Sequence, residues 1–578
     1  LPPVGKTLGG WSRKELFAHF LNMVHARLWL PDFGGSLVNA VGVCATFNGP
    51  SDREFDLQIV SDARQALALR ILWGYFVDST ATDWETFVLK CAGPAVAAKV
   101  SLTSVLKLVE HDCGPDGDVI VCVDELMLCA GGKPERELSD AARVILDSFG
   151  SPVFDNQAFQ RVHVAFSSLR YKPLGDWTTS TKRGMYCPSM PSLTNISSLA
   201  IIDEIGAGWL QDEARVQGSV GGTVRDLVKQ LVLDCAGCPR LIENVVVELR
   251  SSSIKLPDLS LPVLQDRLWG RSVARSCQNA LEEHLMGALL LACSGRRHSA
   301  TELDKYCYLG LLLQAPSIQK NSFAIMPPLL MGMLYRHLSH REEEEDMHSL
   351  EHDVLQACYR FMGLDTFSTS TAISASLFEE QCAHLLRLRL LLLKAQNKTS
   401  FSLEELLPAS LTSDGGRYWT RDGDRRTQFE MPSTPGFQLN KLDDMEIENA
   451  VRRGTARGAI YKPIRNNYEG VDFLVHFPTG QLVAVQCRFS LPTSSTTLDA
   501  KDVPSCINKF KSSYPNLANH TSAFVFLALR KAAGNVTPNP GTDCKGYPSG
   551  FEVAVLSQED VVAITPHSMR ERPQFLSG

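Results

Sequence analysis

The hydrophobic pattern of this chain changes twice along its 578 residues, and these two changes constrain the fold most. Up to about residue 270, short apolar runs alternate with helix-type stretches. From Ser276 to Asn397 leucines recur at helical spacing, and after Lys441 the alternation returns. Apolar runs separated by helical stretches are typical of α/β sheets that are mostly parallel. The sequence therefore predicts a multidomain α/β protein with an all-helical middle.

The predicted organisation has four segments. Residues 1–270 are expected to form an α/β sheet domain and residues 271–397 a helical domain. Residues 398–440, rich in Ser, Thr, Gly, Asp and Pro, indicate a linker or surface excursion. Residues 441–578 are expected to form a second α/β domain. The early strands are predicted at Val38–Phe47, Val119–Val123 and Val162–Phe166; the later ones at Val471–His476, Gln481–Phe489 and Ala523–Leu529.

Composition excludes several classes of protein. An apolar fraction of 44% and a charged fraction of 21% are typical of globular chains, not of disordered or fibrous ones. The net charge of −7 excludes a polycation that coats nucleic acid, but not a local basic groove. The most apolar stretch, Leu385–Leu393, contains two arginines, so no membrane partner is expected. Sixteen scattered cysteines favour a reducing intracellular compartment.

The first residues contain half of a phosphate-binding loop. A P-loop reads G-x-x-x-x-G-K-[ST], and Gly5, Lys6 and Thr7 supply its second half; its first glycine would precede Leu1. Glycine lets backbone N–H groups surround the phosphates, lysine reaches the β- and γ-oxygens, and the Thr7 hydroxyl would hold Mg²⁺. A Gly-Lys-Thr in an ordinary loop is the alternative, so a prediction of nucleotide binding needs a second motif to support it.

A buried-type strand that ends in two acids provides the second motif. Val119–Val123 is followed by Asp124 and Glu125. Open α/β sheets bind ligands at the carboxyl ends of their strands, where Asp124 would orient Mg²⁺ and Glu125 would polarise the attacking water. A core strand ending in two solvated acids is the alternative. Together with the first motif, the pair predicts that the domain binds ATP and Mg²⁺.

Two weaker signals lie downstream. Ser167 and Ser168 follow a predicted strand, where a polar sensor of the γ-phosphate would project. Gly237-Cys238-Pro239-Arg240 follows a predicted helix, Thr223–Asp234; glycine would end this helix and proline would stop it resuming. Both are also common without function. Cys235 and Cys238 form a lone C-x-x-C, which favours packing over zinc or redox chemistry.

This ordered set of motifs resembles the NTPases of Crinkler effectors and is similar to the retrotransposon-hot-spot proteins of trypanosomatids. The set comprises Gly5-Lys6-Thr7, Thr46-Phe47-Asn48-Gly49, Asp124-Glu125, Ser167-Ser168 and Gly237-Cys238-Pro239-Arg240. The resemblance covers about residues 1–270. It implies a STAND or AAA-like P-loop NTPase with Arg240 near the nucleotide, a header domain upstream, and often a restriction-endonuclease-like domain after the NTPase. It also implies a secreted, toxin-like effector that acts in the nucleus of a host cell.

The last third contains a matching pattern of polar residues. Asp472 begins one predicted strand, and Gln486 and Arg488 share one face of the next. This resembles the PD-(D/E)xK nuclease core, in which two acids bind Mg²⁺, a lysine stabilises the phosphate and an upstream helix often adds a glutamate. Here Asp472 and Gln486 would be the metal ligands, and Glu448 or Glu446 would be the helical glutamate.

This sequence departs from that core at two positions. Gln486 replaces an acid, and a neutral amide oxygen binds a hard cation more weakly than a carboxylate. Arg488 replaces the lysine; it still binds phosphate but stays protonated and cannot act as a base. An ordinary hairpin with polar residues on its exposed face is the structural alternative.

Charge favours nucleic acid as the partner of the C-terminal domain, and the resemblance to a nuclease core implies that this nucleic acid is DNA. Residues 441–578 carry a small excess of Lys and Arg although the whole chain is acidic. A basic run precedes Asp472: Arg452, Arg453, Arg457, Lys462 and Arg465. We therefore expect an ATPase that controls a Mg²⁺-dependent DNA nuclease. Two alternatives stay open: an inactive nuclease fold that regulates DNA or chromatin, and a scaffold that forms homo-oligomers on nucleotide binding.

Overall fold

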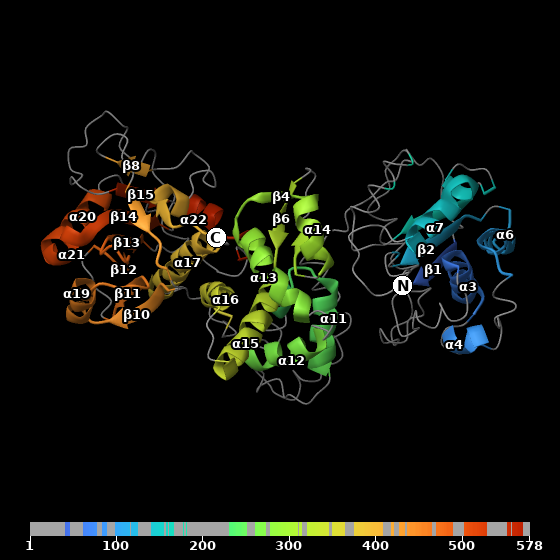
Figure 1. Cartoon of the computed structure of the whole chain (residues 1–578), viewed down its shortest axis with the longest axis horizontal. Helices are drawn as coiled ribbons and strands as arrows, with labels where there is room; N and C mark the ends of the chain where they lie inside the picture. Colours follow the sequence, from blue (N-terminus) through green and yellow to red (C-terminus); the bar gives the residue numbers. More distant parts are fainter. Residues whose placement is uncertain are drawn as a thin grey trace, which may run out of the picture. The chain divides into compact units, whose positions relative to one another are not determined.

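The computed structural model describes part of the chain, in two compact units, residues 1–188 and 189–578 (Figure 1). In the first unit it describes residues 41–46, 62–77, 84–89, 99–115, 117–124, 126, 140–154, 158–159, 161–166, 177 and 181. In the second it describes residues 230–250, 261–272, 278–309, 311–314, 321–345, 349–364, 375–407, 418–420, 427–433, 436–464, 470–488, 502–528, 552–556 and 558–569.

A parallel three-stranded sheet in the order β1-β2-β3 organises the first unit. The strands are β1 (Val41–Thr46), β2 (Val119–Asp124) and β3 (Val162–Phe166), so the three early strands are confirmed. The helices between them are α3 (Ala63–Phe76), α4 (Trp84–Phe87), α6 (Leu102–Asp112), α7 (Asp140–Phe149) and a π-helical turn, η4 (Gly150–Phe154). Helix α3 packs against β1, α6 and α7, and strand valines with helix leucines form one core.

Helices dominate the first part of the second unit, as predicted. They are α11 (Pro239–Arg250), α12 (Leu261–Ser272), α13 (Gln278–Cys293), α14 (Ala300–Tyr308), α15 (Pro328–Glu345), α16 (Leu350–Met362) and α17 (Ala375–Ala395). The region is not all helical, because three short strands pair antiparallel in the order β4-β6-β5. They are β4 (Arg297–Ser299), β5 (Leu313–Gln314) and β6 (Asn321–Ile325).

The turn before α11 differs from its prediction. Gly237 has φ +72°, as a helix-ending glycine should, but Pro239 starts a new helix instead of preventing one. Proline is favoured at the first helical position because its missing N–H has no partner there in any case. Arg240 therefore lies in the first turn of α11.

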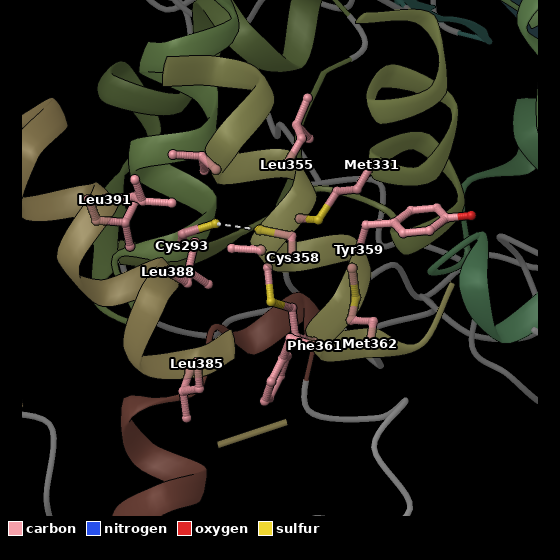
Figure 2. Close-up of a cluster of buried hydrophobic side chains, with 14 of the residues drawn as sticks. Cys293, Met331, Leu355, Cys358, Tyr359, Phe361, Met362, Leu385, Leu388 and Leu391 are labelled. Atoms are coloured by element: carbon pink, nitrogen blue, oxygen red, sulfur yellow. Dashed lines mark hydrogen bonds between the residues drawn. The ribbon is translucent and has the colours of Figure 1, made fainter. Parts of the chain in front are cut away.

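The helical core is closely packed around α13, α15, α16 and α17. Figure 2 shows ten labelled residues of this cluster, in which the thiols of Cys293 and Cys358 point toward each other. Their sulfur atoms lie 3.9 Å apart, and both residues are fully buried. Burial raises the pKa of the Cys358 thiol well above its usual range, so this thiol packs as an apolar group.

A mixed seven-stranded sheet follows, in the order β10-β11-β12-β13-β14-β15-β8. Strand β12 runs antiparallel to β11 and β13, whereas β14 and β15 run parallel to β13. The strands are β8 (Tyr418–Thr420), β10 (Gln438–Leu442), β11 (Ala459–Pro463), β12 (Phe473–His476), β13 (Leu482–Arg488), β14 (Thr521–Ala528) and β15 (Glu552–Leu556). The three later strand predictions are thus confirmed to within two residues at each end.

Part of the predicted linker belongs to this folded unit. Within residues 398–440 lie β8 and the start of β10, and also β7 (Ser400–Ser402), α18 (Leu403–Leu406) and β9 (Gln428–Glu430). Strands β7 and β9 pair antiparallel, and Phe401 and Phe429 are both fully buried. The short strands of this segment were not predicted, because the segment is rich in polar residues that are typical of turns.

Helices cover both faces of the seven-stranded sheet. On one face α19 (Asp444–Arg453), α20 (Asp502–Ser513) and α21 (Pro515–His520) enclose a core with Leu482 and Ala484. On the other, α17 and α22 (Gln558–Ile564) pack over Val483 and Val485. A short 3₁₀ turn, η9 (His567–Met569), contacts β6. The core on the second face is continuous with the helical core, so α17 belongs to both.

Among the described residues, no helix combines the length and the apolar character needed to cross a membrane.

Candidate functional site

The hairpin β12–β13 brings Asp472 and Gln486 into contact. The Asp472 N–H donates to the Val485 carbonyl at 2.8 Å, which fixes the residue beside the strand. Its carboxylate oxygen Oδ2 accepts from the Gln486 side-chain Nε2 and from the Cys487 N–H, each at 2.5 Å. The other Nε2 hydrogen of Gln486 goes to the Cys487 carbonyl at 3.1 Å. The predicted pair is therefore one hydrogen-bonded group.

Two glycines in the turns around this hairpin allow the contact between Asp472 and Gln486. Gly480 closes the turn between the two strands, with φ +79° and its N–H donating to Phe477. Gly470, two residues before Asp472, has φ +92°, and a Cβ there would collide with the carbonyl of Cys506 on α20. Glycine at 470 thus lets the chain approach α20 closely and enter β12 at the right place.

Arg488 points to the opposite side of β13 from Cys487. Its Nη2 donates to the Cys506 sulfur of α20 at 2.9 Å, whereas Cys487 contacts Cys382 of α17. Alternation along the strand places Gln486 on the same face as Arg488, as predicted. Asp472 lies close enough to Arg488 for its positive charge to act on the carboxylate.

Two residues outside the predicted motif complete the site. Lys462 of β11 donates to Glu379 of α17 at 3.1 Å and to the Ser376 carbonyl at 3.3 Å. The Lys462 side chain is 6% exposed and that of Glu379 is 18% exposed, so this ion pair is nearly buried. We call Glu379, Lys462, Asp472, Gln486 and Arg488 the α17–hairpin cluster.

Burial and charge shift the titration of the central carboxylate. The pKa of Asp472 is raised to about 7, chiefly by burial and to a smaller extent by the negative charge of Glu379. The Cys487 N–H, Arg488 and Lys462 act in the opposite direction, because they stabilise the ionised form. A carboxyl that titrates near neutrality can exchange a proton or bind a cation within the physiological range.

The donor set tests whether a metal fits here. The Asp472 and Glu379 carboxylates are hard oxygen ligands, and rotation of the Gln486 amide would turn its Oε1 toward them. In the part of the chain that the structure describes, no group of three or more His, Cys, Asp or Glu could hold a metal ion. Two carboxylates and one amide are fewer ligands than Mg²⁺ takes, so water or a substrate would have to supply the rest.

The two glutamates predicted to assist the site, Glu446 and Glu448 of α19, have partners of their own. Glu448 accepts from its neighbour Arg452 at 3.3 Å and from Asn516 of α21 at 3.4 Å. Glu446 forms the capping box of α19 with Asp443. The structure thus engages both acids of α19 elsewhere, and the carboxylate that acts on Asp472 is Glu379.

Glu379 and Lys462 were missed for understandable reasons. Glu379 precedes Asp472 by more than ninety residues and lies in a leucine-rich helix that was assigned to another domain. Lys462 belongs to the basic run that favours a nucleic-acid partner, yet it is buried against α17. The sequence offered one signal for Lys462. This lysine lies with Tyr461 in an otherwise apolar run of five residues, and a lysine inside a buried strand needs a partner.

The nucleotide motifs are only partly within the described residues. Asp124 ends β2, and its register partner Thr46 ends β1, so both strand ends lie at the same edge of the parallel sheet. β3 ends at Phe166 beside Val123, which puts the chain leading to Ser167 at that edge too. Gly5, Lys6, Thr7, Glu125, Ser167 and Ser168 themselves lie outside the described residues.

Comparison of the chain with models of protein families, with curated proteins and with solved structures gave no match.

Proposed function

We propose that the chain is a nucleotide-controlled protein whose C-terminal sheet cleaves phosphodiester bonds in DNA with the help of Mg²⁺. One observation carries the proposal: Asp472 and Gln486, both singled out by the sequence, are hydrogen-bonded, and the charges of Arg488, Glu379 and Lys462 all act on the Asp472 carboxyl. Carboxylates beside cations are what phosphodiester cleavage requires.

Each residue has a distinct role in this proposal. Asp472 and Glu379, with the Gln486 amide oxygen, would hold Mg²⁺, which supplies Lewis-acid polarisation of the phosphate when bound. Arg488 and Lys462 would bind the phosphate oxygens and stabilise the charge that develops on them. Because Asp472 titrates near neutrality, it must lose its proton before it can bind a cation, so activity should rise with pH up to about 8.

The N-terminal unit would supply the control. The edge of its parallel sheet collects the ends of β1, β2 and β3, as expected for a P-loop NTPase. With Lys6 and Thr7 from the loop, Asp124 and Glu125 would bind ATP–Mg²⁺ and activate water, Ser167 and Ser168 would sense the γ-phosphate, and Arg240 would report nucleotide state to the helices. The resemblance to Crinkler proteins further supports an effector that acts in a host nucleus.

Nicking of supercoiled plasmid DNA in Mg²⁺ or Mn²⁺ tests the nuclease. Asp472→Ala should abolish nicking but preserve DNA binding, because removing a carboxylate lowers repulsion of phosphate. Asp444→Ala, which changes an exposed acid in the first turn of α19, is the matched control and should nick normally. Gln486→Glu should raise activity at low Mg²⁺, since it restores a charged ligand.

A second candidate is a DNA-binding regulator with no cleavage activity. The amide nitrogen of Gln486, not its oxygen, faces Asp472, and Arg488 is bonded to Cys506. Wild-type protein that binds plasmid DNA but never nicks it, with Gln486→Glu equally inactive, would favour this candidate. A mass that increases on adding ATP would instead favour an oligomerising scaffold.

The nucleotide arm is tested separately. Lys6→Ala should abolish ATP binding, whereas Glu125→Gln should bind ATP and hydrolyse it slowly. Arg240→Ala should keep ATP binding and lose any ATP-driven compaction seen by small-angle scattering. Normal hydrolysis by Glu125→Gln would remove that residue from the role of water activator.

A further inference from the structure

A serine, a histidine and a glutamate form a hydrogen-bonded chain between α15 and α16, away from the α17–hairpin cluster. The Ser339 hydroxyl lies 3.0 Å from Nε2 of His352. The other ring nitrogen, Nδ1, lies 2.7 Å from Oε2 of Glu342. A nucleophile, a base and a carboxylate that orients the base define an activated serine by geometry, whatever the fold. We propose that Ser339, His352 and Glu342 form an acyl-transfer site that hydrolyses small uncharged esters.

The surrounding contacts fix the histidine in the required orientation. Glu342 uses its other oxygen, Oε1, to accept from the Ser349 N–H at 2.7 Å, so the carboxylate is held at both ends. The Tyr335 ring stacks on the imidazole, with centroids 5.2 Å apart and planes 12° apart. Nδ1–H therefore donates to Glu342, and the Nε2 lone pair faces Ser339. This is the tautomer that a general base needs.

The chain contains an internal comparison for this geometry. Ser294 lies 2.8 Å from Nε2 of His298, but the Nδ1 of His298 is 4.0 Å from the nearest oxygen of Glu302. Glu302 is committed to the capping box of α14, and the His298 side chain is 1% exposed. The Ser339 set has a tight histidine–carboxylate contact and a half-buried serine beside exposed His340. Both serines are half-buried, so the two sets differ in the orientation of the base, which only the Ser339 set of this pair provides.

The proposed reaction balances as ordinary ester hydrolysis. Ser339 Oγ attacks the acyl carbon while its proton passes to Nε2 of His352; the bond from carbon to the leaving oxygen breaks, and His352 gives the proton to that oxygen. Water then hydrolyses the acyl-serine by the same two transfers. In the present geometry the hydroxyl donates to the Tyr335 carbonyl at 2.9 Å, so its proton has to turn from that carbonyl to Nε2 of His352 before the attack.

Charge and surface chemistry indicate the substrate class. The acids beside the set are compensated, since Glu342 pairs with His352 and Asp353 pairs with Arg387. The Tyr335 ring that stacks on His352 offers an apolar contact, which suits a small uncharged acyl group. The first-turn N–H groups of α16, those of Leu350 and Glu351, are of the type that stabilises an oxyanion, because they have no acceptor within the helix.

A fluorophosphonate probe tests the proposal on the wild-type chain. The probe phosphonylates an activated serine with loss of fluoride, and peptide mass spectrometry should find the adduct on Ser339 and not on Ser294. The labelling rate should rise with pH as the imidazole loses its proton. His352→Gln should slow labelling about 100-fold, Ser339→Ala should abolish turnover of p-nitrophenyl acetate, and Ser294→Ala should change neither.

Three results would overturn the proposal. They are an unmodified Ser339 after prolonged exposure, equal labelling of Ser294 and Ser339, and unchanged ester turnover in Ser339→Ala. The peptide map needs no variant, so it is independent of any folding defect. A purely structural role for the three residues would lower the unfolding temperature of the variants and leave the wild-type serine unlabelled. The plasmid assay of the proposed nuclease is unaffected by any of these outcomes.

Discussion

At the scale of single residues, two buried titratable groups in the second unit set opposite pH dependences. Asp472 has a raised pKa because burial penalises its charge. His476 has a pKa lowered to about 4, by burial first and by His520 second. The two ring nitrogens of His476 find no hydrogen-bond partner among the described residues. Each group favours its neutral form in the folded state, so each destabilises the fold where it must ionise.

We expect Asp472→Asn to flatten the alkaline side of the stability profile. The folded pKa of about 7 lies above the unfolded value of 3.8, so the stabilisation is complete below pH 4 and is lost as the pH rises through 7. The loss amounts to about 4 kcal/mol at most. Urea unfolding at pH 4 to 8 measures it, with Asp444→Asn as the exposed control. A wild-type profile that keeps its full stability at pH 8 would contradict the assignment.

His476→Leu should flatten the acidic side. The folded pKa of His476 lies below the usual 6.5, so its stabilisation is present above pH 6.5 and is lost as the pH falls through 4. Leucine has no ring nitrogens to leave without partners, so at pH 7 the variant should be at least as stable as the wild type. Thermal unfolding from pH 4 to 7 provides the measurement. His111→Leu, at an exposed position of the first unit, should change neither end.

At the scale of elements, α17 decides the character of the site. Its first turns contact three strands. Glu380 pairs with Lys441 of β10, and Glu379 pairs with Lys462 of β11. Cys382 contacts Cys487 of β13. Its later turns pack against α16. The helix thus determines the electrostatics of a hairpin that lies far from it in sequence.

Glu379→Gln should lower the pKa of Asp472. The charge of Glu379 raises that pKa, and a neutral glutamine removes the repulsion while keeping an oxygen for Lys462. The pH window in which stability is lost should therefore move toward acid. Carboxyl carbon NMR of Asp472 follows the titration directly. Glu380→Gln, one position along the same helix, should leave the pKa of Asp472 nearly unchanged, and an equal shift in both variants would argue against a specific contact.

The elements were largely predictable from sequence, and the reasons are local. Short valine-rich runs such as Val119–Val123 and Val162–Phe166 are bounded by polar residues and rich in β-branched side chains, which favours a strand. The contact of Asp472 with Gln486 was predictable because both belong to one hairpin. The contact of α17 with this hairpin was not predictable, because the leucines of α17 indicate that the helix is buried but not which element covers it. The strands β7, β8 and β9 could not be predicted, because a strand of three residues is too short to show an alternation of apolar and polar side chains.

At the scale of the whole chain, the two units have separate cores. The two described apolar clusters of the first unit and the two of the second share no member across the units. Within the second unit, by contrast, the helical core continues into the seven-stranded sheet. The predicted boundaries at residues 270, 397 and 440 do not coincide with the division at residue 188.

Fragments of the chain should therefore behave unequally. Residues 189–578 should unfold cooperatively on their own, since they contain all of their described core. Residues 398–578 and 441–578 should not, because removing α17 exposes Val483 and Val485 and leaves Lys462 without its carboxylate partner. Circular dichroism during heating distinguishes the two outcomes. A cooperative transition in residues 441–578 would show that α17 is dispensable.

The double membership of α17 has a consequence for synthesis of the chain. Translation proceeds from the N-terminus, so α17 leaves the ribosome 87 residues before β13 begins, counted from Ala395 to Leu482. During that interval the side of the helix that later covers the sheet has nothing to pack against, although its other side can already join α16. Nascent chains of this length are the ones that expose apolar surface and attract chaperones. In the ribosome-bound intermediate, one side of α17 can therefore be packed while the other side is still exposed. Glu379 and Glu380, at the start of the helix, have no lysine partners until β10 and β11 have been synthesised.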